Sequence, residues 1–265
     1  MTTCSRKEGE NLMAKLRIIP LGGLGEVGKN MTAFEYGDDI VVVDCGSIFP
    51  RQDMLGIDLV IPDISYLTRN RERVRAYLIT HGHEDHIGAV PYVFPNVPAP
   101  VYGTKLTCAL IQGKLAEHNI GGITLHVVKP RQTVQIGEFS VQFIKVSHSI
   151  AGAVAMAITC PAGTVIITGD FKIDYTPIDG EVTDLNTLAA WGERGVLALM
   201  ADSTNVERPG YTMSERRSGK RFTVFSRTPR GASLSQCSPP ICTESSRLWT
   251  TAWSSDGRSA LSAAA

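Results

Sequence analysis

The stretch LITHGHEDHIGAV, residues 78–90, decides the fold of this chain and most of its chemistry. An apolar strand predicted at 74–80 ends at Thr80 and releases HGHEDH, residues 81–86, into a turn. Three imidazoles and two carboxylates within six residues are donors suited to zinc or a similar divalent ion. A lone histidine is more often exposed or simply hydrogen-bonded. An H-x-H-x-D-H turn directly after a buried-type strand instead predicts a metal site.

The spacing within this turn divides the donors between two ions. The alternate residues His81 and His83 can point to one ion, whereas the adjacent Asp85 and His86 can reach a second ion on the other side. Gly82 is expected to let the chain turn tightly between them. The pattern therefore predicts a binuclear centre.

Three further polar residues stand at predicted strand ends. His148 follows FSVQFIKVS, Asp170 ends GTVIITGD, and Asp44 follows DIVVV. Strand-end residues at one edge of a sheet converge in space, and sites are commonly built there. Taken alone, Asp170 could cap a turn and His148 could be a surface histidine. Together with the histidine-rich turn they predict one site, in which the Asp170 carboxylate could bridge two cations.

Strands dominate the chain from about Leu16 to Asp202. Helical patterns are fewer and fall at 104–118, directly after His86, and at 185–194. This alternation predicts an α+β fold in which two mixed β-sheets pack together between outer helices. The predicted strands are residues 16–21, 30–36, 39–44, 74–80, 123–128, 139–146, 153–159, 163–168 and 196–202. His118 falls at the end of the helix predicted at 104–118, and His126 falls within the strand predicted at 123–128. Neither is predicted to be a ligand.

The glycine-rich stretch GGLGEVGKN, residues 22–30, matches two phosphate-binding patterns, G-x-G-x-x-G and G-x-x-x-x-G-K. Both patterns require a helix immediately after the loop, because the helix N-terminus binds the phosphate. Residues 30–44 instead alternate as two strands joined at Gly37. The glycines are therefore predicted to shape a loop between strands, not a nucleotide site.

The amino-acid composition bears on whether the protein is a membrane, secreted or cytoplasmic protein. The 265 residues are 43% apolar, yet no apolar run approaches the roughly 18 to 20 residues of a membrane span. The first residues lack the apolar segment of a signal peptide. Six cysteines without a C-x-x-C pair indicate reduced thiols and a cytoplasmic protein. The net charge of zero says nothing about partners.

Composition changes abruptly after about Arg216. Residues 217–265 contain 11 serines, against 8 in the 216 residues before them, and they carry a net charge of +5. Valine and isoleucine almost vanish, so the segment lacks the periodic apolar residues of a core. A disordered serine-rich tail and a shifted reading frame both fit this composition.

The motifs together resemble a known family. HGHEDH (81–86), His148, Asp170 and Asp44 match, in order, the motifs of the metallo-β-lactamase superfamily. Several further stretches are similar to the ribonuclease J family of the β-CASP branch, and the resemblance covers about residues 13–215. These stretches are PLGGLGEVGKN (20–30), VDCGSIFP (43–50), HSIAGA (148–153), TGDFKID (168–174) and ADSTNVERPGYTMSE (201–215).

The resemblance implies a metal-dependent ribonuclease that matures and degrades RNA as a 5′–3′ exonuclease, an endonuclease or both. It implies two divalent ions, with zinc expected and Mn²⁺ or Mg²⁺ as alternatives. It also implies an RNA substrate, a homo-oligomer or an RNA-decay complex as assembly, and no membrane. By carry-over of family roles, His81, His83 and His148 hold one metal, Asp85 and His86 hold the other, and Asp170 bridges them. Asp85 orients the attacking water, and Asp44 orients the ligands from behind.

The family pattern also sets expected boundaries within an incomplete metallo-β-lactamase fold. Residues 1–12 are expected to be an upstream leader, since Lys7-Glu8-Gly9 can be encoded as AAGGAGG, a ribosome-recruiting purine run, shortly before Met13. Residues 13–205 form the N-terminal part of the metallo-β-lactamase domain, 206–216 begin the β-CASP region, and 217–265 are a frameshifted tail. In the family a later histidine completes the second metal site, and none follows His148 here. We therefore expect the chain to be an inactive, truncated form.

Two other functions stay open on the sequence. One is a small-molecule hydrolase of the same fold, such as a thioesterase or lactonase. The other is a non-catalytic fragment that binds metal without turnover.

Overall fold

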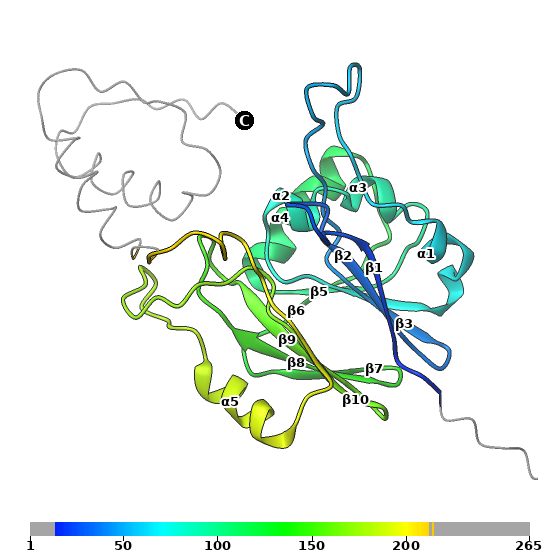
Figure 1. Ribbon diagram of the computed structural model, residues 1–265. Helices are drawn as coiled ribbons and strands as arrows, with labels where there is room; N and C mark the ends of the chain where they lie inside the picture. Colours follow the sequence, from blue (N-terminus) through cyan, green and yellow to red (C-terminus); the bar gives the residue numbers. More distant parts are fainter. Residues whose placement is uncertain (1–13, 212–213, 215–265) are drawn as a thin grey trace, which may run out of the picture.

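The computed structural model describes residues 14–211 and Ser214. Two sheets form the body of the protein (Figure 1). The first sheet has the order β1-β2-β3-β4-β5-β6 and the second has the order β11-β10-β9-β8-β7. The first comprises β1 (Arg17–Gly22), β2 (Met31–Tyr36), β3 (Asp39–Val43), β4 (Val74–Leu78), β5 (Val101–Gly103) and β6 (Leu125–Val127). The second comprises β7 (Thr133–Ile136), β8 (Phe139–Lys145), β9 (Val154–Cys160), β10 (Gly163–Ile167) and β11 (Ala198–Met200).

Both sheets are mixed, as the sequence predicts. In the first sheet β1, β2 and β3 pair antiparallel, and β3 to β6 pair parallel. In the second sheet β7 to β10 pair antiparallel, and β11 joins β10 in parallel. The glycine-rich loop leads directly into β2, so the expectation of a loop between strands is confirmed. No helix follows it to bind a phosphate.

Helices cover the outer faces of the two sheets. The helices α1 (Ser65–Arg69), α2 (Glu84–Ile87), α3 (Val90–Val93) and α4 (Lys105–Glu117) lie over the first sheet, and α5 (Leu185–Arg194) lies over the second (Figure 1). A short 3-10 turn, Arg71–Arg73, precedes β4. The four layers give the αββα architecture that the sequence predicts.

The alternation of side chains along the strands explains this layering. In β4 and the residue after it, Tyr77 and Ile79 pack toward the helices, whereas Ala76 and Leu78 pack between the sheets. In β8, Val141 and Phe143 join the same inter-sheet core. A strand with apolar residues on both faces is stable only when both faces are covered. Each sheet therefore needs a helical layer as well as the other sheet.

Several elements were not predicted. The strands β5 and β7 are three and four residues long, and α1 is five residues long. Such short segments show too little periodicity to identify from sequence. Conversely, the helices predicted at 104–118 and 185–194 are confirmed as α4 and α5, and the helix predicted after His86 is α3.

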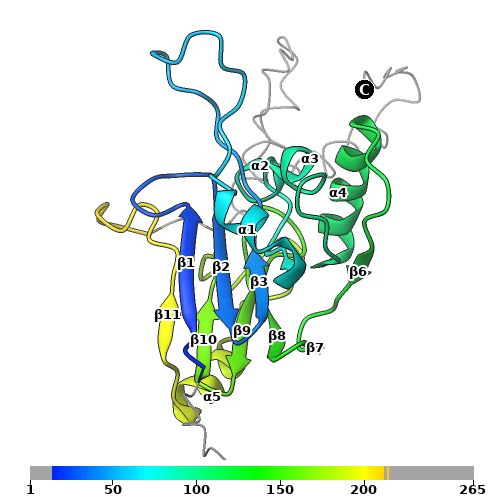
Figure 2. The same ribbon diagram turned by 90° about the vertical axis from the view of Figure 1, so that its right-hand side faces the viewer.

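The loop between β3 and α1 projects away from both sheets, as two perpendicular views show (Figures 1 and 2). Among residues 14–211, no helix is long and apolar enough to cross a membrane. The leader predicted at 1–12 and the tail predicted at 217–265 lie outside the described residues. The β-CASP start predicted at 206–216 is described only to Tyr211 and at Ser214.

Candidate metal centre

The histidine-rich turn is held by backbone hydrogen bonds to the chain that leaves β3. The Cys45 N–H donates to the His86 carbonyl at 2.8 Å, and the Ser47 N–H donates to the Glu84 carbonyl at 3.1 Å. Gly46 lies between these contacts, and a Cβ there would overlap the carbonyl oxygen of Asp85. The exit of β3 thus fixes the position of α2 and of the donors that it carries.

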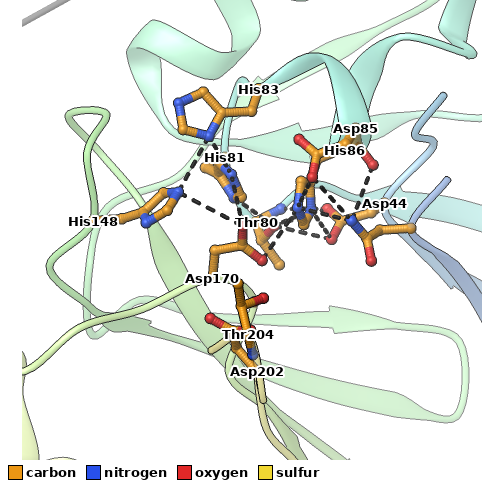
Figure 3. Close-up of polar contacts among 12 residues, drawn as sticks. Asp44, Thr80, His81, His83, Asp85, His86, His148, Asp170, Asp202 and Thr204 are labelled. Atoms are coloured by element: carbon orange, nitrogen blue, oxygen red, sulfur yellow. Dashed lines mark hydrogen bonds and ion pairs between the residues drawn. The ribbon is translucent and has the colours of Figure 1, made fainter. Parts of the chain in front are cut away.

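Three imidazoles converge on one point. The His83 Nδ1 lies 3.0 Å from the His81 Nε2 and 3.1 Å from the His148 Nε2 (Figure 3). Burial lowers the pKa of His81 well below its usual value and that of His148 to about 4, and it also lowers the pKa of His83. Neutral rings carry the free lone pairs that a metal ligand needs.

A second group lies beside the first. Donor atoms of His81, Asp85 and His86 all lie within 4.8 Å of one another, as do those of His81, His83 and His148. Asp170 stands between the groups, with its Oδ2 3.7 Å from the His148 Nε2 and its Oδ1 3.3 Å from the His86 Nε2. All the predicted ligands therefore meet at one edge of the two sheets.

Asp44 lies behind this cluster and is almost fully buried. Its Oδ2 lies 2.8 Å from the His86 Nδ1, and its Oδ1 accepts from the Thr80 N–H at 2.8 Å. The Thr80 hydroxyl also donates to Asp44 and lies 3.1 Å from the His81 Nδ1. A carboxylate that accepts from Nδ1–H leaves Nε2 as the His86 nitrogen that faces the cluster.

The carboxylates and His86 influence one another strongly. Burial disfavours the charged ring, but Asp44, Asp170 and Asp85 outweigh it and raise the pKa of His86 well above its usual value. Burial likewise opposes ionisation of Asp85 and Asp170, yet contact with His86 lowers the pKa of both carboxyls. Three carboxylates around one imidazole make a site with excess negative charge.

These residues fit divalent ions. The His83 Nδ1 lies 3.0 Å from one imidazole nitrogen and 3.1 Å from another, and a cation shared by the three neutral rings would stabilise such an arrangement. The three carboxylates around His86, those of Asp44, Asp85 and Asp170, supply the negative charge that offsets a second cation. The buried His83 Nε2 also has no hydrogen-bond partner among the described residues.

Not every acidic or histidine side chain joins the site. The Glu84 carboxylate turns outward and pairs with the Lys114 Nζ at 2.7 Å. His118 contacts Tyr92, and His126 stacks on Tyr102 at 4.6 Å between ring centroids. Both histidines are outside the site, as the sequence predicts.

Gly169 and Gly82, two glycines close to the predicted ligands, are needed for different reasons. Gly169 has a φ of 56°, and a Cβ there would lie 2.8 Å from the Thr80 Cβ, so it provides the sharp exit expected before Asp170. The tight turn expected of Gly82 does not involve a left-handed backbone. Gly82 instead leaves room for Leu110 of α4, whose Cδ1 would lie 2.5 Å from an added Cβ.

Sequence reasoning missed two residues that contact the predicted ligands, Thr80 and Asn30. Thr80 is the last residue of the predicted strand, so its place beside His81 was the available signal. The Asn30 Nδ2 lies 3.0 Å from the His86 Nε2, but these residues are 56 positions apart. Only the fold brings them together.

The fold and this site define the class of protein. A family model described as the metallo-β-lactamase superfamily matches residues 24–208. The chain therefore belongs to the metallo-β-lactamase superfamily and carries the histidine-rich site of a divalent-metal protein.

Among curated proteins, the chain is similar to ribonuclease J. It is 45% identical over 223 residues to ribonuclease J of Thermus thermophilus, a match that covers 81% of this chain and 39% of the relative. It is 50% identical over 203 residues to ribonuclease J of Synechocystis sp., covering 76% and 32%, respectively. The resemblance to the N-terminal portion of ribonuclease J is thereby confirmed, and the chain spans about a third to two fifths of these relatives.

Solved structures support the fold alone. A protein of unknown function from Enterococcus faecalis superposes with a TM-score of 0.68 at 18% identity, over 89% of this chain and 63% of that protein. Unliganded yeast PDE1 superposes with a TM-score of 0.51 at 14% identity, over 90% and 95%, respectively.

Proposed function

We propose that this chain carries the metal centre of a binuclear, metal-dependent ribonuclease of the ribonuclease J type. In this proposal His81, His83 and His148 hold one ion, and Asp85 and His86 hold the other. The observation that carries the proposal is the convergence of two donor groups at one sheet edge, in a chain 45% identical to a ribonuclease J.

Asp170 is proposed to bridge the two ions. Its two carboxylate oxygens face different groups, since Oδ2 is nearer to His148 and Oδ1 is nearer to His86. One carboxylate can bind a cation through each oxygen. The geometry thus supports a single side chain that serves both ions.

The donor set favours zinc for the ions. Four imidazole nitrogens and two carboxylates suit zinc, whereas Mg²⁺ prefers sites made of oxygen donors. Mn²⁺ is the alternative, and Mg²⁺ is disfavoured. When bound, two such ions supply Lewis-acid stabilisation of negative charge on a phosphodiester and lower the pKa of water.

The protein's own groups orient the reaction. Contact with His86 lowers the pKa of Asp85, so this carboxylate is ionised at neutral pH and available to orient the attacking water or to take its proton. Asp44 holds the His86 ring through Nδ1 and fixes its direction. We assign the catalytic role to Asp85 and the orienting role to Asp44.

RNA is the proposed substrate because the similarity to ribonuclease J extends over more than three quarters of the chain. Exonucleolytic and endonucleolytic cleavage are both compatible with this assignment. A homo-oligomer or an RNA-decay complex is the proposed assembly. A cytoplasmic location agrees with the free thiols of Cys45, Cys108 and Cys160.

A chimera tests this function, because the chain spans only part of its relatives. Residues 14–211 replace the matching segment of Thermus thermophilus ribonuclease J, and the product is incubated with 5′-labelled RNA and a divalent metal. We expect metal-dependent RNA cleavage that is abolished in the matched Asp85→Asn chimera.

Two outcomes would contradict the proposal. A chimera that hydrolyses a thioester or a lactone but not RNA supports a small-molecule hydrolase. A chimera that binds metal without any turnover supports a non-catalytic site. The same assay on the 265-residue chain tests the prediction from the sequence that this chain does not cleave RNA by itself.

A further inference from the structure

The glycine-rich loop, residues 22–30, lies against the metal centre and leads into β2 rather than into a helix. Its last residue, Asn30, is half-buried, and the side-chain nitrogen Nδ2 contacts two donors of the second group, Asp85 and His86. This nitrogen lies 3.4 Å from the Asp85 Oδ2 and 3.0 Å from the His86 Nε2. The carboxamide therefore touches the two atoms proposed to bind the second ion.

The partners of this amide determine its orientation. Nδ2 also lies 3.2 Å from the backbone carbonyl oxygen of Asp85. The Asp85 carbonyl oxygen and the Asp85 Oδ2 are both acceptors. They therefore require the N–H₂ edge of Asn30 and would repel its oxygen. The two amide hydrogens can then serve the Asp85 carbonyl and carboxylate together. This pairing survives when an ion takes the His86 lone pair.

Backbone hydrogen bonds hold Asn30 in this place. Its N–H donates to the Asp85 carbonyl at 3.0 Å, and its own carbonyl accepts from the Gly46 N–H at 3.0 Å. Asn30 is thus connected to α2 on one side and to the exit of β3 on the other. Its amide is a fixed group rather than a surface side chain that happens to lie nearby.

One glycine of the loop, Gly23, leaves the space that the Asn30 amide needs. Gly23 has a φ of 86°, and a Cβ there would lie 2.6 Å from the Asn30 Oδ1. Gly25 has a φ of 69°, but an added Cβ there would meet no atom within 4 Å. Only Gly23 faces the Asn30 amide.

We propose that Asn30, held by the glycine-rich loop, is a positioning residue for the second ion and acts by fixing the Asp85 carboxylate. This inference rests on the proposed binuclear centre. Hydrogen bonds to ligating carboxylates orient them, and the loss of such partners typically costs about 10- to 100-fold in metal affinity. The loop therefore serves the hydrolytic site rather than a phosphate.

The test is a Co²⁺ titration of the purified metal-free 265-residue chain, followed by visible absorption and metal content. Co²⁺ substitutes for zinc and reports coordination by its spectrum. In Asn30→Ala we expect the second equivalent to bind about 10-fold more weakly, with an altered spectrum, while the first equivalent binds as in the wild type. Asn96→Ala is the control, because the Asn96 amide donates to the Tyr92 carbonyl away from the site.

A pair of glycine variants separates positioning from general loop damage. Gly23→Ala and Gly25→Ala impose similar backbone strain, but only the first displaces the Asn30 amide. Gly23→Ala should reproduce the Asn30→Ala spectrum and affinity, and Gly25→Ala should match the wild type.

If Asn30→Ala binds the second equivalent of Co²⁺ as tightly as the wild type does, this inference is overturned and the proposed binuclear centre still stands. Indistinguishable behaviour of the two glycine variants also overturns it. A wild-type chain that binds fewer than two equivalents contradicts the proposed centre itself.

Discussion

Replacing Asp44 with Asn tests how the protein presents His86 to an ion. Asp44 has a φ of 62°, a left-handed conformation that asparagine also tolerates, so the exchange keeps the backbone. The amide oxygen can still accept from the Thr80 N–H. The amide nitrogen, however, then faces the His86 Nδ1 and donates to it. That moves the ring proton to Nε2, the atom proposed to bind the metal.

The size of the effect follows from the contacts that are lost. The 2.8 Å bond between the Asp44 Oδ2 and the His86 Nδ1 is charge-assisted, and such a bond contributes about 1.5–3 kcal/mol. Since about 1.4 kcal/mol corresponds to a factor of ten, this is roughly a 10- to 100-fold loss of affinity for the second ion. The first ion is held by other residues and should be affected much less.

Competition with a chelator measures both affinities. Asp39→Asn is a matched control, because Asp39 is also buried but stands at the opposite end of β3 and bonds to the Arg75 Nε at 2.5 Å. Asp39→Asn should lower the free energy of unfolding without changing metal affinity. If Asp44→Asn binds its second ion within twofold of the wild type, the proposed control of the His86 ring by Asp44 is wrong.

Three further predictions concern stability. The pKa of His148 is lowered to about 4 in the folded protein, so the unfolded chain takes up a proton first as the pH falls. The metal-free protein should therefore lose stability between about pH 6.5 and 4. His148→Gln should lessen that loss when Tm is measured as a function of pH. Gly46→Ala would drive a Cβ into the Asp85 carbonyl and should cost at least about 2 kcal/mol in urea denaturation; an unchanged midpoint would argue against this packing. Lys114→Ala removes a partly exposed ion pair with Glu84 and should cost under about 1 kcal/mol, with metal content unchanged; a larger loss would show that the pair supports the turn.

The sequence predicts the site well where the signal is local. Asp44, His148 and Asp170 are each recognisable because a β-branched strand ends just before them, and the two sheets bring those strand ends together. The histidine-rich turn is recognisable without tertiary information, since four of its six residues are candidate ligands, His81 and His83 for one ion and Asp85 and His86 for the other.

Contacts between residues far apart in the sequence cannot be predicted from a local sequence pattern. Asn30 reaches Asp85 because both segments are hydrogen-bonded to the exit of β3, and no sequence pattern near Asn30 predicts that contact. Gly46 has no turn conformation and is needed only because α2 approaches it closely. The strand β5 is missed for a related reason, because its pairing with β4 and β6 supplies what three residues alone cannot.

The central claim is a binuclear centre that shares Asp170, and metal content per chain tests it most directly. The wild-type protein, His148→Ala and Asp170→Ala are purified in parallel, loaded with zinc, dialysed and analysed for metal. We predict two ions per chain in the wild type and about one in His148→Ala. In Asp170→Ala we predict loss of much of both, because one carboxylate serves both ions. Metal content equal to the wild type in both variants would contradict the claim.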